Sequence, residues 1–74
     1  MIQIEVHEDE VFLSADAAGI DALIESLAYI KAGGDHDHFM SPAWGGSELT
    51  EGLRIRTDST PVNHLKIFFV YPSH

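Results

Sequence analysis

The sequence predicts a small α+β protein in which an antiparallel sheet of four to five strands packs on one amphipathic helix. Three observations predict this class: an alternation of apolar and polar residues at the N-terminus, one apolar stripe at helical spacing, and a long apolar run near the C-terminus. A chain of 74 residues has room for one domain, so residues 1–74 are expected to form a single α+β unit.

The N-terminal residues predict a β-hairpin. Ile2, Ile4 and Val6 alternate with polar residues, which is the pattern of a half-buried strand. Residues 7–10 are polar and suited to a turn, and residues 11–15 are apolar enough for the second strand.

The next segment predicts the helix. Asp16 is the expected N-cap, with Ser14 as the alternative, and Gly33–Gly34 is the expected end. Five apolar residues recur at helical spacing between these limits and form one stripe, which we expect to face the sheet: Ile20, Leu23, Ile24, Leu27 and Ile30.

Three further strands complete the predicted order β-β-α-β-β-β. Residues 35–40 are expected to form the third strand and residues 62–71 the strongest one, ended by Pro72. Residues 49–57 predict a weaker strand between them. The proline and glycines in 42–47 indicate an irregular loop before it.

One helix can cover only one face of this sheet. Alternation in the last strand places one set of residues toward the helix: Leu65, Ile67, Phe69 and Tyr71. The opposite face then presents His64, Lys66, Phe68 and Val70. Two large apolar side chains on a face that no helix covers predict a homodimer formed through the open sheet face.

The acidic charge predicts the class of partner. Nine acidic residues in 1–37 stand against Lys31 alone, so the whole net charge of −8 lies in the first half. Nucleic-acid binding requires cationic surface and is not expected. A basic protein partner is compatible with this charge, and the acidic turn Glu8, Asp9 and Glu10 is the expected contact.

Sequence features also predict the compartment. Neither a signal peptide nor a run of roughly 20 apolar residues, as a membrane span requires, is visible. The chain has no cysteine. We therefore expect a cytoplasmic protein without disulfides and without membrane association.

Histidines at alternate positions suggest a metal site. His36 and His38 would share one face of the third strand, and two imidazoles at that spacing can bind zinc or nickel. His64 is the expected third ligand, with Glu48 or a partner histidine as alternatives. Asp35 and Asp37 would face the other way, and Lys66 would place a cation beside the metal.

Trp44 has two interpretations. It can fold over the sheet edge and cap the core, which we favour, or it can be an exposed anchor for a protein partner. Catalysis is not predicted, because no nucleophile motif surrounds Ser41, Ser47 or Ser59.

The second half of the chain, residues 36–67, resembles immunity protein family thirty-two, small bacterial proteins of polymorphic toxin systems. The motifs that carry this resemblance are His36-x-His38-x-Met40-x-Pro42-x-Trp44-Gly45-Gly46-x-Glu48-Leu49 and Asn63-His64-Leu65-Lys66-Ile67.

The resemblance implies a non-enzymatic protein that binds and neutralises a cognate toxin. Under this interpretation no cofactor is needed, and the acidic first half would meet a basic toxin. The alternative is a small homodimeric protein that binds zinc or nickel through His36 and His38.

Overall fold

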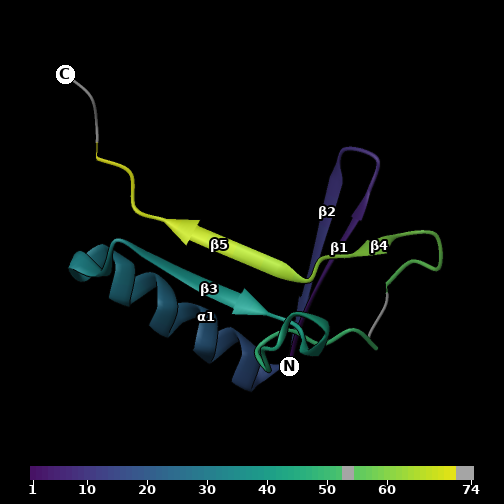
Figure 1. Ribbon diagram of the computed structural model, residues 1–74, viewed down its shortest axis with the longest axis horizontal. Helices are drawn as coiled ribbons and strands as arrows, with labels where there is room; N and C mark the ends of the chain where they lie inside the picture. The colour runs from purple at the N-terminus through teal and green to yellow at the C-terminus, as the bar shows by residue number, and fades with distance from the viewer. Residues whose placement is uncertain (53–54, 72–74) are drawn as a thin grey trace.

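The computed structural model describes residues 1–52 and 55–71 and has one α-helix with five strands (Figure 1). In chain order the elements are β1 (Ile2–His7), β2 (Glu10–Ala15), α1 (Ala17–Tyr29), a π-helical turn (Ile30–Gly34), β3 (His36–Met40), a 3₁₀ turn (Pro42–Trp44), β4 (Thr60–Pro61) and β5 (His64–Phe68). The predicted α+β class is confirmed.

The strands form two antiparallel sheets instead of one. The first sheet has the order β2-β1-β4, and the second pairs β3 with β5. The chain passes between them over residues 61–63: the Val62 N–H donates to the Ile4 carbonyl at 2.8 Å, and the Ser41 N–H donates to the Asn63 carbonyl at 2.9 Å. The apolar run 62–71 is therefore divided between a link and a short strand.

The strand expected over 49–57 is not confirmed, and neither is the predicted order that includes it. Residues 49–52 and 55–57 form no strand, and residues 53–54 lie outside the described part of the chain. Two backbone N–H groups of this segment donate to β1 without forming a strand ladder. The Thr50 N–H donates to the Ile2 carbonyl at 2.7 Å, and the Ile55 N–H donates to the Glu5 carboxylate at 2.8 Å. These contacts fix the segment as a loop against β1.

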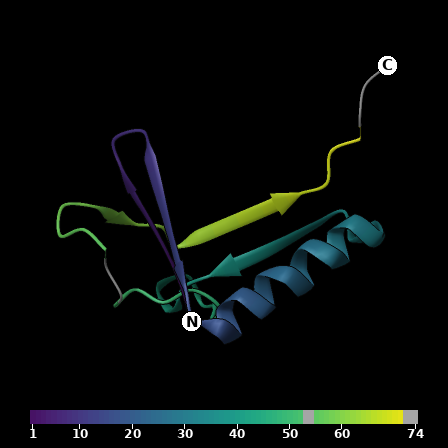
Figure 2. The same cartoon turned by 180° about the vertical axis from the view of Figure 1, so that it is seen from behind.

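The helix begins as predicted. The Asp16 carboxylate accepts the Gly19 N–H at 2.8 Å and also contacts the terminal ammonium of Met1. The axis runs alongside β3 in both ribbon views (Figures 1 and 2). The single π-helical turn that follows ends at the expected glycine pair, Gly33–Gly34.

The face that the helix turns to the sheets differs from the predicted stripe. Gly19 and Ser26 are its buried residues, followed by Ile30 in the π-helical turn, and Leu23 is half-buried. Three stripe residues are instead between 46% and 58% exposed: Ile20, Ile24 and Leu27. Gly19 lets the start of the helix lie against Met1 and Ile2, and the Ser26 hydroxyl reaches Asp37 of β3. This orientation leaves most of the stripe on the outside.

The core joins the two sheets. Its buried side chains are Ile2 and Ile4 of β1, Phe39 of β3 and Leu49. Half-buried apolar residues surround this cluster: Ala15, Leu23, Val62, Leu65 and Ile67. Within the described ranges, no helix is both long and apolar enough to cross a membrane.

Candidate functional site

The face of the β3–β5 sheet that points away from α1 carries the histidines. Asp37 points to the helix, where it accepts the Ser26 hydroxyl at 2.7 Å. Strand alternation therefore places His36 and His38 on the opposite face. The register pairs His36 with Phe68 and Met40 with His64, so β5 adds His64, one of the possible third ligands, to the same face.

Five aromatic rings form a continuous row across this face. The rings of Phe68 and His36 lie 5.5 Å apart, those of His36 and His38 4.9 Å, those of His38 and His64 5.2 Å, and those of His64 and Trp44 5.6 Å. We call these five residues the histidine face. They come from both strands and from the turn that follows β3.

The closest contact within the histidine face joins His38 to His64. The His38 Nδ1 lies 3.0 Å from the His64 Nε2, and the ring planes differ by only 25°. The ring centroids are much further apart than these nitrogens, so the rings meet edge to edge. One nitrogen must donate a proton and the other must accept it, because a neutral imidazole has one donor and one acceptor.

His36 has a different partner. Its Nδ1 lies 3.1 Å from the Asp35 carboxylate. Asp35 precedes the strand and has a φ of +72°, so it does not follow the alternation that turns Asp37 toward the helix. The expectation that both aspartates point away from the histidines is therefore correct for Asp37 and wrong for Asp35.

A complete metal site is not formed by the part of the chain that the structure describes. Within 1–52 and 55–71, no group of three or more His, Asp or Glu side chains is arranged to hold a metal ion. His38 and His64 converge, whereas His36 is turned to Asp35. Glu48, the alternative ligand, binds the neighbouring Ser47 N–H at 2.7 Å through its carboxylate.

Trp44 is 58% exposed, so the favoured prediction that it caps the core is wrong. The turn Pro42–Trp44 ends at Gly45, whose φ of +84° is the left-handed conformation that the glycine was expected to supply. The buried Ser41 hydroxyl donates to the Asn63 side chain at 2.8 Å and anchors this turn to the segment before β5. The indole is thus held on the surface, next to His64.

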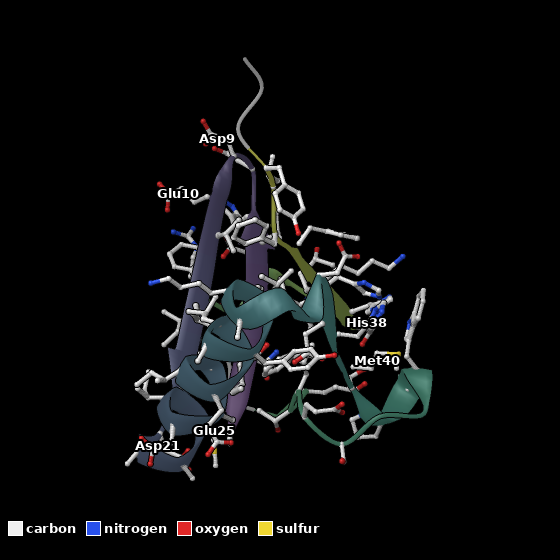
Figure 3. All side chains as sticks on the ribbon, turned by 90° about the vertical axis from the view of Figure 1, so that its left-hand side faces the viewer. Asp9, Glu10, Asp21, Glu25, His38 and Met40 are labelled. Atoms are coloured by element: carbon white, nitrogen blue, oxygen red, sulfur yellow. The ribbon has the colours of Figure 1, made fainter. Side chains whose placement is uncertain are left out.

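The acidic residues expected to contact a partner lie at the tip of the β1–β2 hairpin and are all exposed: Glu8, Asp9 and Glu10. We call this the acidic tip. In Figure 3 the labelled Asp9 and Glu10 lie well apart from the labelled His38 and Met40. The structure therefore separates the acidic tip from the histidine face, where Trp44 lies.

Charged groups also connect the hairpin to the loop before β4. The Arg56 guanidinium donates to both oxygens of Asp58 at 2.9 Å and lowers the pKa of that carboxyl to about 2. The His7 Nε2 lies 3.1 Å from the same carboxylate. No sequence pattern indicated this cluster, because His7 and Asp58 are far apart along the chain.

A groove of about 370 Å³ lies between α1 and β3 and was not predicted. Its polar groups include Glu25, Ser26, Asp37 and Glu48. The Ser26 hydroxyl and then the His38 N–H lower the pKa of Asp37, and the Ser47 N–H lowers that of Glu48. The Asp37 and Glu48 carboxylates therefore both accept hydrogen bonds within the chain.

No protein-family model, no curated protein and no solved structure matches this chain.

Proposed function

We propose that this protein is a non-enzymatic, cytoplasmic protein-binding domain of the immunity type, which neutralises a cognate bacterial toxin by covering part of its surface. One observation supports protein binding above all. Among the described residues, twelve large apolar or aromatic ones are exposed, whereas only five apolar ones are buried in the core. Exposed apolar residues that gather on one element, as Ile20, Ile24 and Leu27 do on α1, are typical of a surface that binds another protein.

Exposed apolar side chains would supply the binding free energy. Ile20, Ile24 and Leu27 project from α1, and Val11 and Leu13 project from β2 at the edge of its sheet. Trp44 adds a large aromatic anchor held on a short turn, and tryptophan is enriched among residues whose truncation costs most in binding.

The acidic tip would supply long-range attraction. Glu8, Asp9 and Glu10 are fully available to a partner, and the net charge of −8 makes the whole chain attractive to a basic one. Such charge raises the association rate and selects against acidic partners more than it raises affinity. A basic toxin is therefore the partner class that we assign.

The test uses the toxin encoded by the neighbouring gene and two double variants of equal charge change. Asp9→Lys/Glu10→Lys reverses the acidic tip, whereas Asp21→Lys/Glu25→Lys reverses two exposed residues of α1 (Figure 3). We expect the tip variant to lower the association rate by about tenfold at low salt and to weaken its salt dependence. The helix variant should change the rate much less.

Two results would contradict the proposal. Equal losses in both variants would show that only net charge matters and that the acidic tip is not the contact. Failure of the wild-type protein to bind or neutralise the toxin would reject the immunity function itself.

A second candidate function is supported by the contact between His38 and His64. Two imidazole nitrogens 3.0 Å apart on neighbouring strands resemble part of a site for zinc or nickel. The alternative is a small metal-binding homodimer, and the inference below gives it a specific form.

A further inference from the structure

The His38 and His64 nitrogens are spaced almost as metal ligands are. Zinc binds histidine at about 2.0–2.1 Å, so two nitrogens on one tetrahedral ion lie roughly 3.4 Å apart. The observed distance is 3.0 Å, and both residues are half-buried on neighbouring strands. His38 pairs with Lys66 and His64 with Met40, so the two histidines are diagonal neighbours. A small swing of each ring about its side-chain bonds opens enough space for the ion.

Proton positions also permit this change. The hydrogen bond between the rings places one proton on either His38 Nδ1 or His64 Nε2. When that proton occupies the other nitrogen of its own ring, both facing nitrogens present lone pairs. The imidazoles stay neutral, so ligation requires a change of tautomer and no net loss of a proton.

One chain cannot complete the site. Structural zinc sites have four protein ligands, and catalytic zinc sites have three protein ligands together with a water molecule or the substrate. His38 and His64 supply two, and no further His, Asp or Glu of the described ranges joins them in a metal-holding arrangement. Because the chain has no cysteine, imidazole is its best ligand for zinc, nickel or copper.

We propose that the histidine face binds one divalent zinc-class ion between two copies of this chain, with His38 and His64 of each copy as the four ligands. A twofold axis through the ion repeats the same two ligands and gives a tetrahedral set. The site is incomplete without the second copy. This proposal does not depend on toxin binding.

The surroundings of the two ligands fit a contact between copies. Phe68 and Trp44 lie at the two ends of the aromatic row and are both more than half exposed, so pairing would bury apolar area around the ion. Each copy carries a net charge of −8, which opposes association, and the cation offsets part of that repulsion at the contact. Lys66, opposite His38 in the register, is exposed and can extend its ammonium group away from the ion.

The test measures mass and stoichiometry of the untagged protein with zinc chloride alone. Light scattering on a sizing column should show the mass of one chain in EDTA and of two chains with zinc, and titration calorimetry should give one ion per two chains. His38→Asn/His64→Asn should abolish both effects. His7→Asn, on the other sheet, should leave them unchanged.

NMR of the wild-type protein provides a second measurement that needs no variant. The ring-proton signals of His38 and His64 should shift together with zinc, while that of His7 stays in place. Three results would each overturn the proposal. They are a mass that is the same in zinc and in EDTA, a stoichiometry of one ion per single chain, and zinc-dependent pairing of the His38→Asn/His64→Asn variant.

Discussion

At the scale of single residues, Glu5 shows that a segment far along the chain can bury a side chain that the strand pattern places on the exposed face. The alternation of apolar and polar residues placed Glu5 on a half-buried strand with its side chain toward water. In the structure it is fully buried: its carboxylate accepts the Ser59 hydroxyl at 2.5 Å and the Ile55 N–H at 2.8 Å. The segment that covers it lies some fifty residues further along the chain, which no local pattern in β1 reveals.

We therefore expect Glu5→Ala to be strongly destabilising. The substitution leaves the Ser59 hydroxyl and the Ile55 N–H without this acceptor, and a loss of this kind costs about 2–3 kcal/mol. Glu10→Ala, at an exposed site of the same hairpin, should stay within about 0.5 kcal/mol. Urea unfolding followed by circular dichroism measures both values, and equal losses would contradict the role assigned to Glu5.

The histidines show what alternation alone can predict. The sequence placed His36 and His38 on one face of a strand, because side chains in a strand alternate with a fixed period, and indicated His64 as a possible third ligand. That His64 shares this face follows from the pairing of β3 with β5, which the sequence did not predict. The direction of the Asp35 side chain depends on the positive φ of Asp35 itself, just before the strand. The position of Trp44 depends on a turn that Ser41 anchors to Asn63. Neither feature has a periodic signal in the sequence.

At the scale of elements, the helix buries its smallest side chains. A Cβ at Gly19 would lie 2.2 Å from the Met1 carbonyl oxygen, which is itself held by the Asp16 N–H at 3.1 Å. Ser26 makes the second close approach, through its hydrogen bond to Asp37. Hydrophobic periodicity identified the helix but not its buried face, because a glycine and a serine carry no hydrophobic signal. The N-cap was predicted separately, from the residue type of Asp16.

Gly19→Ala tests this close approach. Alanine favours a helix by about 1 kcal/mol over glycine, so an unconstrained site would gain stability. Here the new methyl group meets backbone, and we expect overpacking to prevail with a net loss of about 1–2 kcal/mol. Gly52→Ala, where an added Cβ meets nothing within 4 Å, is the control. A higher melting temperature for Gly19→Ala would show that the helix does not approach β1 this closely.

The division of the strands into two sheets also could not be predicted from patterns in the sequence. Residues 62–71 read as one long strand, yet the Val62 N–H bonds β1 while β5 begins at His64 and pairs with β3. The residue at which the chain leaves one sheet and joins the other is set by the strand that each backbone N–H group meets in space. The α+β class and the helix were predictable, and the sheet to which each short strand belongs was not.

At the scale of the whole molecule, the fold leaves two separate surfaces for contact. The acidic tip and the histidine face lie apart from each other (Figure 3), and the exposed side of α1 adds a further apolar surface. A toxin bound at the tip alone would leave the histidine face free for a second copy. Trp44 is an anchor in the proposed toxin contact and also belongs to the histidine face, so its use by the toxin would make zinc-dependent pairing and toxin binding compete.

Acid sensitivity is also a property of the whole molecule, because carboxylates with lowered pKa values tie its parts together. The Asp37 carboxyl joins β3 to α1, and that of Asp58 pairs with Arg56; both have pKa values below the ordinary 3.8. The unfolded chain thus binds protons more readily than the folded one, so this stability is present above about pH 4 and is lost as pH falls toward 2. Protonation of the other acids relieves repulsion and acts in the opposite direction.

Asp37→Asn isolates one of these groups. At neutral pH the variant should be less stable than the wild-type protein, because Ser26 and the His38 N–H lose a charged acceptor. Between about pH 5 and about pH 2.5 it should lose less stability than the wild-type protein, because it has no proton to take up at this site. Asp21→Asn, which removes the same charge from an exposed helical position, should keep the wild-type profile. Urea midpoints across this pH range provide the comparison, and parallel profiles for Asp37→Asn and the wild-type protein would show that the contact with Ser26 does not favour the ionised carboxylate.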